Sequence, residues 1–512
     1  MRFQSTNPDP GYPIVYLAGG PGGSGIAAAR GKRFPLFMAL RKVADVIVLD
    51  QRGTGASNTI PPCTVPKPSF ADKPVVLTRE TEMVFMRGAV KHCIAFWRDK
   101  GIDLSAYDTR ENALDLTTLR KALGVDKLNL WGISYGGTLA LAALKVMPEH
   151  IDRVVIASPL SMSQTVRLPA RTQDFLERVA ALLKSDPKLG KVYPDLIGTM
   201  TSVLDRLDKK PVHVILHSPK GKPVTLVIGQ FPIQFATIRM LKNPDTLRYL
   251  PIMYSAMAAG RYRLVAGQLY KAFSRPFTLG GMGLAVRAAS CLSPQREKLV
   301  EKQAKTTLLG NTLNVFTETV RGIGIPPLDR DFCKPIHSDV PVLILTGTLD
   351  GRTYPAGHAQ ILAGLSHGSE VVIENAGHDL FMSSPKVTKD IVAFLSHRPV
   401  KYRHIKLLIP NFITVLAICA GMTGIRLAVE GRFEPAVMMV LLAAFLDGID
   451  GRAARLLKAQ TRFGVQMDSL ADIISFGVAP ALVLYVFLLD QAGPFGWIAA
   501  LVYAIAAGLR LA

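Results

Sequence analysis

Hydrophobic positions along this chain follow two patterns. In the first 395 residues, short apolar runs alternate with mixed stretches and polar turns, whereas from about Leu407 onward long apolar runs are broken only by short polar turns. Apolar strands that alternate with helices are typical of a parallel sheet covered on both faces. Apolar runs approaching ~20 residues are typical of membrane helices. The pattern therefore predicts an α/β unit followed by an all-α membrane unit.

The apolar runs of the first unit set its expected boundaries. Strand-like runs lie within residues 12–25, 44–57, 127–159, 340–350 and 369–380. Between the third and fourth of these the chain carries a candidate hairpin, VHVILHSPKGKPVTLVIG, and helices rich in Leu, Met and Ala. We expect a sheet core from 1–157 and 340–397, a cap inserted at 158–339, a basic linker at 398–406 and a membrane unit at 407–512.

Composition favours a membrane partner. The 512 residues are too many for one ordinary core. The hydrophobic share is 49% and the mean hydropathy is +0.26, which is high for a purely soluble protein. A net charge of +21 indicates an anionic partner, either nucleic acid or an anionic membrane surface. Because no nucleic-acid motif is present, we expect a lipid bilayer and no nucleic acid.

The N-terminus and the cysteines bear on the compartment. No apolar signal-peptide core precedes the first strand-like run, so the sequence does not support export by a cleaved signal. Cys419 lies in an apolar run, and no Cys spacing suggests zinc. The other four cysteines are either free thiols or, in an oxidising compartment, two disulfides. They are Cys63, Cys93, Cys291 and Cys333.

The pentapeptide Gly132-Ile133-Ser134-Tyr135-Gly136 carries the chemistry of the first unit. A G-x-S-x-G between a strand and a helix is a nucleophile elbow, in which small flanking residues let the chain turn sharply and present the serine Oγ. Asp350 and His378 follow, each after a predicted strand. We expect His378 to accept the serine proton and Asp350 to orient the imidazole. The backbone N–H groups of Tyr135 and of the Gly19–Gly20 turn would bind the oxyanion.

Each of these residues has a competing interpretation. Ser134 could be an ordinary helix N-cap, and the histidines His358 and His367 compete with His378. His358 lies in a predicted helix and His367 in a polar turn, so we rank His378 ahead of both. Asp379 would point elsewhere. We expect Asp50 and Arg52 to shape a turn, and the basic, aromatic stretch at 260–277 to be a solvated helix face rather than a substrate contact.

The motifs GGPGGSG, DQRGTGAS, GISYGGTLA, TGTLDGRTYP and NAGHD together resemble the proline iminopeptidase and tripeptidyl-aminopeptidase-like branch of the α/β-hydrolases over about residues 12–395. The resemblance implies an α/β-hydrolase fold and a serine hydrolase of aminopeptidase type without a cofactor. Ala18, where many iminopeptidases carry His, favours the tripeptidyl-aminopeptidase-like group. That group implies the pairs Cys63–Cys93 and Cys291–Cys333. Relative to it, the N-terminus looks shortened.

Four aspartates mark a second site. Asp447 and Asp450 share one helix face with Ala454, and Asp468 and Asp472 share a face of the next helix with Gly464. Small residues let two membrane helices approach closely. Four converging carboxylates would repel one another unless metal ions bound them, and hard oxygen ligands suit Mg²⁺ or Mn²⁺. Two metals on a pyrophosphate would fit the charge.

The pattern D-x-x-D-G-x-x-A-R-x8-G-x-x-x-D-x-x-x-D resembles the CDP-alcohol phosphatidyltransferase family, and RFGVQMDSLADIISFGVAPALVLY resembles its CDP-diacylglycerol–serine branch, the phosphatidylserine synthases. The resemblance implies CDP-diacylglycerol and L-serine as substrates. It implies that Asp447, Asp450, Asp468 and Asp472 hold the metal and that Asp472 is also the base on the serine hydroxyl. Gly451, Ala454, Arg455 and Gly464 would line the nucleotide pocket. The family has about six core helices, so we expect a unit cut short after the fourth.

Charge around the first apolar helix predicts the topology. Lys and Arg crowd the segment before that helix, which places the first unit in the cytoplasm in a multi-pass inner-membrane protein. We accordingly expect a thiol count to find the four cysteines of the first unit free. Three hypotheses follow: a bifunctional enzyme, a hydrolase with the helices as anchor, or a composite of two gene fragments. The hydrolase substrate is a peptide or an ester, including a lysophospholipid, and the membrane unit offers a surface for a homodimer.

Overall fold

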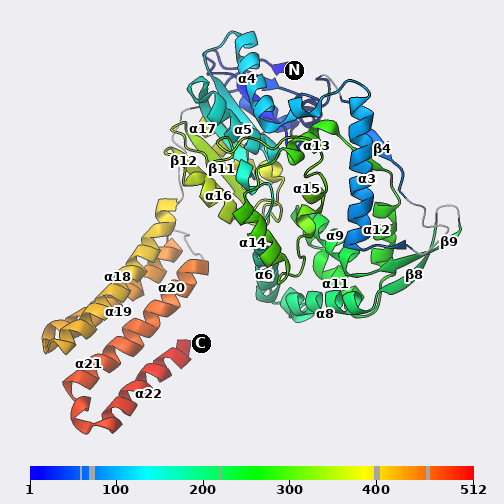
Figure 1. Ribbon diagram of the computed structural model, residues 1–512. Coiled ribbons are helices and arrows are strands. Elements are labelled where there is room, and N and C mark those ends of the chain that lie inside the picture. Colours follow the sequence, from blue (N-terminus) through cyan, green and yellow to red (C-terminus); the bar gives the residue numbers. More distant parts are fainter. Residues whose placement is uncertain (58–59, 68–74, 219–220, 397–403, 457–461, 512) are drawn as a thin grey trace. The chain divides into compact units, whose positions relative to one another are not determined.

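The computed structural model describes residues 1–57, 60–67, 75–218, 221–396, 404–456 and 462–511 (Figure 1). The side chains of 75, 404–411, 453–456, 462–466 and 510–511 are outside that description. The chain divides into two units, Met1–Pro399 and Val400–Ala512, and each is described by itself. Most of the expected linker therefore falls outside the described residues.

A seven-stranded sheet forms the centre of the first unit, in the order β1-β3-β2-β6-β7-β11-β12. Every neighbouring pair is parallel except the edge strand β1, which runs antiparallel to β3. The strands are β1 (Arg2–Phe3), β2 (Ile14–Leu17), β3 (Val46–Val48), β6 (Leu128–Ile133), β7 (Ile151–Ala157), β11 (Val342–Gly347) and β12 (Gly368–Ile373). The sequence predicted all of these strands but β1, whose two residues are too few to form an apolar run.

Alternation along the strands directs side chains to both faces of the sheet. Val15 and Leu17 of β2 belong to a core shared with α4 (Thr109–Leu123) and α5 (Tyr135–Val146). Tyr16 of the same strand instead meets Trp131 of β6 and Phe37 of α2 (Phe34–Leu40), with ring centroids 4.6 and 4.9 Å apart. Both faces are thus covered, which explains the nearly continuous apolar runs of these strands. The expected α/β class is confirmed.

Residues between β7 and β11 form most of a cap with its own core. Its helices include α6 (Pro169–Ser185), α8 (Leu196–Lys209), α9 (Gln230–Met240), α11 (Leu250–Ala258), α12 (Arg263–Phe273), α13 (Gly281–Ala288), α14 (Pro294–Ala304) and α15 (Val315–Thr319). The expected hairpin is present as β8 (Val212–His217) and β9 (Pro223–Ile228). Strand β5 (Val75–Val76) extends it from outside the cap. Buried residues of α12, such as Leu269, pack into the cap core, as a solvated helix with one apolar face would.

The first unit contains two disulfides, so the expectation of free thiols is wrong. Cys63 is bonded to Cys93 and Cys291 to Cys333. The pairs follow from packing: Cys63 lies in β4 (Cys63–Val65), which contacts the long helix α3 (Arg79–Arg98) that carries Cys93. Charge patterning near a membrane helix contains no information about such contacts. The pairing implied by the family resemblance is the one observed.

Removing one disulfide should destabilise the first unit measurably. We expect the double variant Cys291→Ser, Cys333→Ser to lower the free energy of unfolding by about 2–4 kcal/mol, because the bridge constrains the unfolded chain. The measurement is a urea titration in detergent without reductant, followed through the buried Trp97 and Trp131. Cys419→Ser, which removes an exposed free thiol, is the control and should leave the midpoint unchanged. An unchanged midpoint in the double variant would contradict the prediction.

The second unit is entirely helical in the residues described. It comprises α18 (His404–Val429), α19 (Phe433–Leu456), α20 (Arg462–Asp472), a π-helical turn at Ile473–Val478, α21 (Ala479–Phe487) and α22 (Pro494–Leu511). Helices α18 and α19 run antiparallel (Figure 1). Gly424 lies against Ala436 and Gly421 against Ala443, so small residues bring these two helices together.

Two segments of the described chain are long and apolar enough to cross a membrane. They are Phe412–Val429 and Met467–Phe487, and the apolar stretch Pro494–Leu509 is shorter. The second segment differs from the sequence-based estimate, which began the apolar run after Asp472. In the structure the helical path continues from α20 through the π turn into α21, so Asp468 and Asp472 lie within the same run as the apolar residues that follow.

Candidate active sites

Ser134 lies at a sharp turn between β6 and α5. Its backbone has φ 56° and ψ −120°, a conformation rarely adopted by a residue other than glycine. A Cβ on Gly136 would lie 2.0 Å from the carbonyl oxygen of Leu17, and one on Gly132 would lie 2.5 Å from the oxygen of Gly136. Both positions therefore require glycine. Ser134 makes no side-chain cap bond to α5, which removes the N-cap interpretation of this residue.

Asp350 and His378 meet beside this turn. Asp350 follows β11 and accepts a hydrogen bond from Nδ1 of His378 at 2.9 Å. Thr353 donates to the same carboxylate through its hydroxyl at 2.6 Å and through its backbone N–H at 3.0 Å. Burial alone would raise the pKa of Asp350, but the charge and hydrogen bond of His378 and the bonds from Thr353 hold it well below its usual range. Asp350 is therefore an anion that fixes the orientation of the imidazole.

The expected oxyanion donors adjoin the serine. Tyr135 is the first residue of α5, where a backbone N–H has no acceptor within the helix. Gly19 lies so close to the elbow that a Cβ would stand 2.9 Å from the oxygen of Ile133 and 3.2 Å from Cβ of Ser134. Gly20 follows with φ +136°, which favours glycine. The Gly19–Gly20 turn therefore lies against the elbow that carries Ser134.

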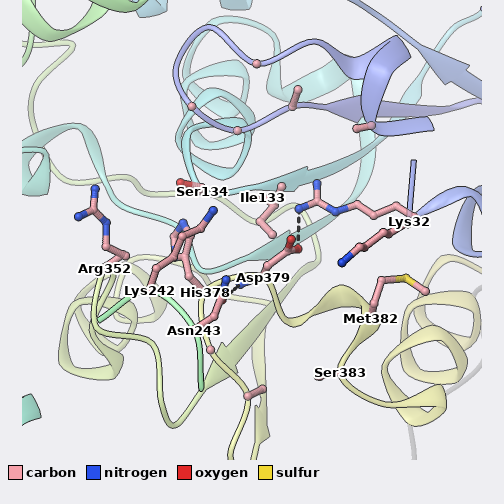
Figure 2. A pocket seen from close by; sticks show the side chains of 18 of the residues that line it. Lys32, Ile133, Ser134, Lys242, Asn243, Arg352, His378, Asp379, Met382 and Ser383 are labelled. Atoms are coloured by element: carbon pink, nitrogen blue, oxygen red, sulfur yellow. Dashed lines mark hydrogen bonds and ion pairs between the residues drawn. The ribbon is translucent and has the colours of Figure 1, made fainter. Parts of the chain in front are cut away.

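One cavity of about 900 Å³ brings these residues together. Ser134 and His378 line it with Gly19, Gly20, Lys32, Arg167, Lys242 and Arg352. Figure 2 shows the side chains of Lys242 and Arg352 on the same side of the cavity as His378. No hydrogen bond joins Ser134 Oγ to His378 among these described atoms. Such bonds often tighten only when substrate binds.

The competing residues have other roles. His367 is exposed in a turn, and Asp379 forms an ion pair with Arg33 at 2.5 Å.

Asp50 accepts hydrogen bonds from Ser24 Oγ and from the backbone N–H groups of Ile26 and Ala56. Burial would raise its pKa, but these bonds lower it. Arg52 binds Asp115 through two nitrogens at 2.7 and 2.6 Å. Asp50 and Arg52 are thus structural, as expected from the sequence.

His358 should make the first unit sensitive to acid. It lies fully buried in α16 (Pro355–Leu362), where burial lowers its pKa from 6.5 to about 4, although the charge of Asp350 opposes the shift. The unfolded chain binds the proton near pH 6.5 and the folded chain near pH 4. Stability is therefore complete above pH 6.5 and falls as the pH drops toward 4, by up to about 3 kcal/mol.

The variant His358→Gln should remove most of that dependence. Unfolding midpoints in urea at pH 6.5, 5.5 and 4.5 would be compared with those of wild type. His367→Gln, an exchange at an exposed histidine, serves as the control and should keep the wild-type slope. Equal slopes in all three proteins would show that another group governs the acid response.

Carboxylates also converge in the second unit. Ligand oxygens of Asp447, Asp450 and Asp468 all lie within 4.8 Å of one another. Asp472 contacts Asp447 through its side chain, so the fourth aspartate joins the same cluster. Thr414 of α18 donates its hydroxyl proton to Oδ2 of Asp450 at 2.5 Å. Three helices therefore position the cluster, which the sequence had assigned to two.

The cluster has the features of a cation site. Oδ1 of Asp447 and Oδ1 of Asp450 are buried and have no hydrogen-bond partner among the residues whose side chains the structure describes. Buried carboxylate oxygens without donors are costly unless a cation binds them. Among the described residues, nothing lies within 4 Å of a Cβ built on Gly448 or Gly451. The side chains of Ala454 and Arg455 and the surroundings of Gly464 lie outside the described residues.

Sequence reasoning missed several neighbours of these sites. Thr353 supports Asp350, Thr414 supports Asp450, and Arg167 and Arg352 line the cavity at Ser134. Arg352 and Thr353 follow Asp350 by two and three residues in TGTLDGRTYP, so their local turn was accessible from the sequence. Thr414 and Arg167 are brought in by tertiary packing, which leaves no local signal.

Comparison with known families gives two matches in this chain. Residues 12–385 match the alpha/beta hydrolase fold family. Residues 407–512 match the CDP-alcohol phosphatidyltransferase family. Among solved structures, the chain is similar to the proline iminopeptidase of Mycobacterium smegmatis, with 16% sequence identity and a TM-score of 0.37 over 77% of this chain and 93% of that chain.

Curated relatives of the second unit share one enzyme name. The chain is 51% identical over 105 residues to the CDP-diacylglycerol–serine O-phosphatidyltransferase of Mycobacterium tuberculosis, which is 20% of this chain and 36% of the relative. It is 40% identical over 105 residues to the enzyme of that name from Helicobacter pylori, again 20% of this chain and 44% of the relative. The chain thus spans less than half the length of these relatives.

Proposed function

Because the chain belongs to the alpha/beta hydrolase fold family and carries a CDP-alcohol phosphatidyltransferase domain, we propose that it is a bifunctional membrane enzyme. The first unit would hydrolyse an acyl substrate at Ser134. The second would transfer a phosphatidyl group from CDP-diacylglycerol to L-serine, giving phosphatidylserine and CMP. The observation that carries the first assignment is the Asp350–His378 hydrogen bond beside the positive-φ serine.

Hydrolysis at this site would proceed through an acyl-enzyme. Ser134 Oγ forms a bond to the substrate carbonyl carbon while its proton passes to Nε2 of His378. The oxyanion is held by the N–H groups of Tyr135 and the Gly19–Gly20 turn. The leaving group departs with the proton from His378. Water then gives one proton to His378 and its hydroxyl to the acyl carbon, and Ser134 regains its proton from the imidazole. Asp350 stabilises the imidazolium at each stage.

The transferase assignment rests on the aspartate cluster and on the relatives of the second unit. Asp472 would accept the proton of the serine hydroxyl, which attacks the phosphorus bound to diacylglycerol and displaces CMP. Thr414 fixes Asp450, and Gly451 leaves room for the nucleotide beside it. Asp447, Asp450, Asp468 and Asp472 would hold Mg²⁺ or Mn²⁺. When bound, the cation would offset the negative charge of the pyrophosphate.

The location of the chain follows from the same unit. The two apolar segments and the relatives of this unit support membrane association, and we place α18, α19 and the α20–α21 run across the bilayer. Basic residues before α18 predict a cytoplasmic first unit. Closed disulfides are instead typical of an oxidising compartment. The charge pattern and the disulfides therefore favour opposite sides of the membrane for the first unit.

Two assays test the proposal. Membranes that contain the full chain should release CMP from CDP-diacylglycerol when serine and Mn²⁺ or Mg²⁺ are added, and a chelator should stop the release. A fluorophosphonate should label Ser134 and block ester hydrolysis. Absence of serine-dependent release from inserted protein would leave the hydrolase as the activity of the chain. Absence of labelling would instead eliminate the hydrolase.

A further inference from the structure

The cavity at Ser134 carries an excess of positive charge. Among the described residues that line it, five are cationic and two are carboxylates besides the catalytic groups. One carboxylate, Asp379, is paired with Arg33, and the other, Asp245, is exposed. Asp350 accepts hydrogen bonds from His378, from Thr353 and from the backbone N–H of Arg352. Its charge also acts on the guanidinium groups of Arg167 and Arg352, but among the described residues it forms no ion pair with either. A substrate in this cavity therefore meets several cations that no ion pair neutralises.

Two of the lining cations, Arg167 and Arg352, are guanidinium groups that lie near a third, Arg287, which is outside the lining. Arg167 donates to the carbonyl oxygens of Arg352 and Thr165, and Arg352 donates to that of Ile238. Arg287 donates to the oxygens of Gly283 and of Gly20, in the oxyanion turn itself. Within the described residues, every hydrogen bond from these three guanidinium groups ends on a backbone carbonyl. None of them ends on a carboxylate.

The three guanidinium groups are also near one another. Burial, and then the charge of Arg352, lowers the pKa of Arg167 and that of Arg287 to about 10. Both groups nevertheless remain cations at neutral pH. Keeping like charges together away from water is costly unless an anion joins them. Arginine is also the side chain best suited to bind a carboxylate or phosphate through two parallel hydrogen bonds.

We propose that the hydrolase cavity takes an acyl substrate bearing a carboxylate or phosphate group, which Arg167 and Arg352 bind while the carbonyl carbon lies at Ser134. This inference rests on the proposed hydrolase function. It disfavours a free N-terminal amine, since an ammonium group would meet more cations than carboxylates in this lining. The anion belongs either to a soluble substrate or to a phospholipid.

The test compares an anionic and a neutral p-nitrophenyl ester on the full chain in detergent. We expect kcat/KM for p-nitrophenyl hydrogen glutarate to exceed that for neutral p-nitrophenyl butyrate by about tenfold or more, with the ratio falling at high salt. Alanine p-nitroanilide should be the poorest substrate. The rate of hexanoic acid release from dihexanoyl phosphatidate is compared with the rate of hydrolysis of the glutarate ester. This comparison distinguishes a phospholipid substrate from a soluble one. A ratio of one or less, or faster turnover of the alanine substrate, would overturn the proposal.

Variants identify the residues responsible for the preference for the anionic ester. Arg352→Met and Arg167→Met should each bring the glutarate-to-butyrate ratio toward one, and Arg352→Lys should retain part of it. Both rates are measured on the same preparation of each protein, so partial misfolding lowers them equally and leaves their ratio unchanged. Arg261→Met, which removes an exposed cation outside the cavity, should keep the wild-type ratio. A preference that survives both methionine variants would also overturn the assignment.

Failure of the hydrolase is distinguished by labelling. If fluorophosphonate labels Ser134 but no ester is turned over, the labelling is repeated in the presence of methyl hydrogen glutarate or of methyl butyrate. The extent to which each compound protects Ser134 from the label then gives the same comparison of an anionic with a neutral ligand. Stronger protection by the anion supports the proposal, and equal protection refutes it. An unlabelled Ser134 would refute the hydrolase and this inference together.

Discussion

Ser134→Ala should abolish ester hydrolysis, with kcat reduced by about 10³- to 10⁶-fold, the range found when a triad member is removed. The reason is specific to this turn. Ser134 makes no cap bond to α5, so its hydroxyl contributes nothing to the helix, and its loss removes only the nucleophile. We therefore expect an almost unchanged urea midpoint beside the lost rate. Fluorophosphonate labelling should disappear as well.

Ser293→Ala is the matched control for this experiment. Ser293 caps α14 by accepting a hydrogen bond from the N–H of Arg296 at 3.1 Å. Its loss should cost about 1 kcal/mol of stability and leave the rate intact. The two serines thus have opposite expected effects, one on rate and one on stability. A Ser134→Ala protein that still hydrolyses esters at the wild-type rate would show that the turn is only structural.

Asp472→Asn should eliminate serine-dependent CMP release. Loss of a general base lowers rates by about 10²- to 10⁴-fold, and here the same change also removes one charge from the four-carboxylate cluster. The amide is nearly isosteric with the carboxylate, so packing at the π turn after Asp472 should survive. The measurement is CMP release in membranes, at saturating Mn²⁺ and again over a range of metal concentrations. We expect no metal concentration to restore the rate.

Asp490→Asn provides the comparison in the same unit. Asp490 is an exposed carboxylate in the turn Leu489–Ala492, outside the cluster. Its exchange should leave CMP release within about twofold of wild type, as expected for a surface substitution. Equal activity of wild type and Asp472→Asn would contradict the role of the aspartate as base. Equal loss in both variants would instead indicate damage to the unit.

The sequence predicted most of the architecture because the relevant signals are local. Strands such as β6 and β11 are buried on both faces, so they read as continuous apolar runs. The elbow at Ser134 was recognisable because its two glycines flank the serine at fixed spacing, although the contact that requires Gly136 is with Leu17 of a distant strand. The aspartate pairs share helix faces at fixed spacing. In each case a short window of sequence carries the signal.

What the sequence could not provide depends on packing between distant segments. Thr414 of α18 forms a hydrogen bond with Asp450 of α19, and Arg287 forms one with Gly20, which lies 267 positions earlier in the sequence. The cationic wall of the cavity comes from separate loops of the core and cap, so no stretch of sequence shows it. The prediction of free thiols failed for the same reason: proximity of Cys63 and Cys93 is set by the contact of β4 with α3.

On the topology proposed above, with α18 and α19 both across the bilayer, the antiparallel pairing of these helices would make the cysteines a reporter for a site in the other unit. The chain would enter through α18 and return through α19, so Asp450 would lie on the side of the membrane from which α18 entered. The redox state of Cys63, Cys93, Cys291 and Cys333 would then report the solvent that the aspartates meet. A gel-shift count of alkylated thiols, taken from cells quenched in acid, would tell on which side of the membrane any CMP is released.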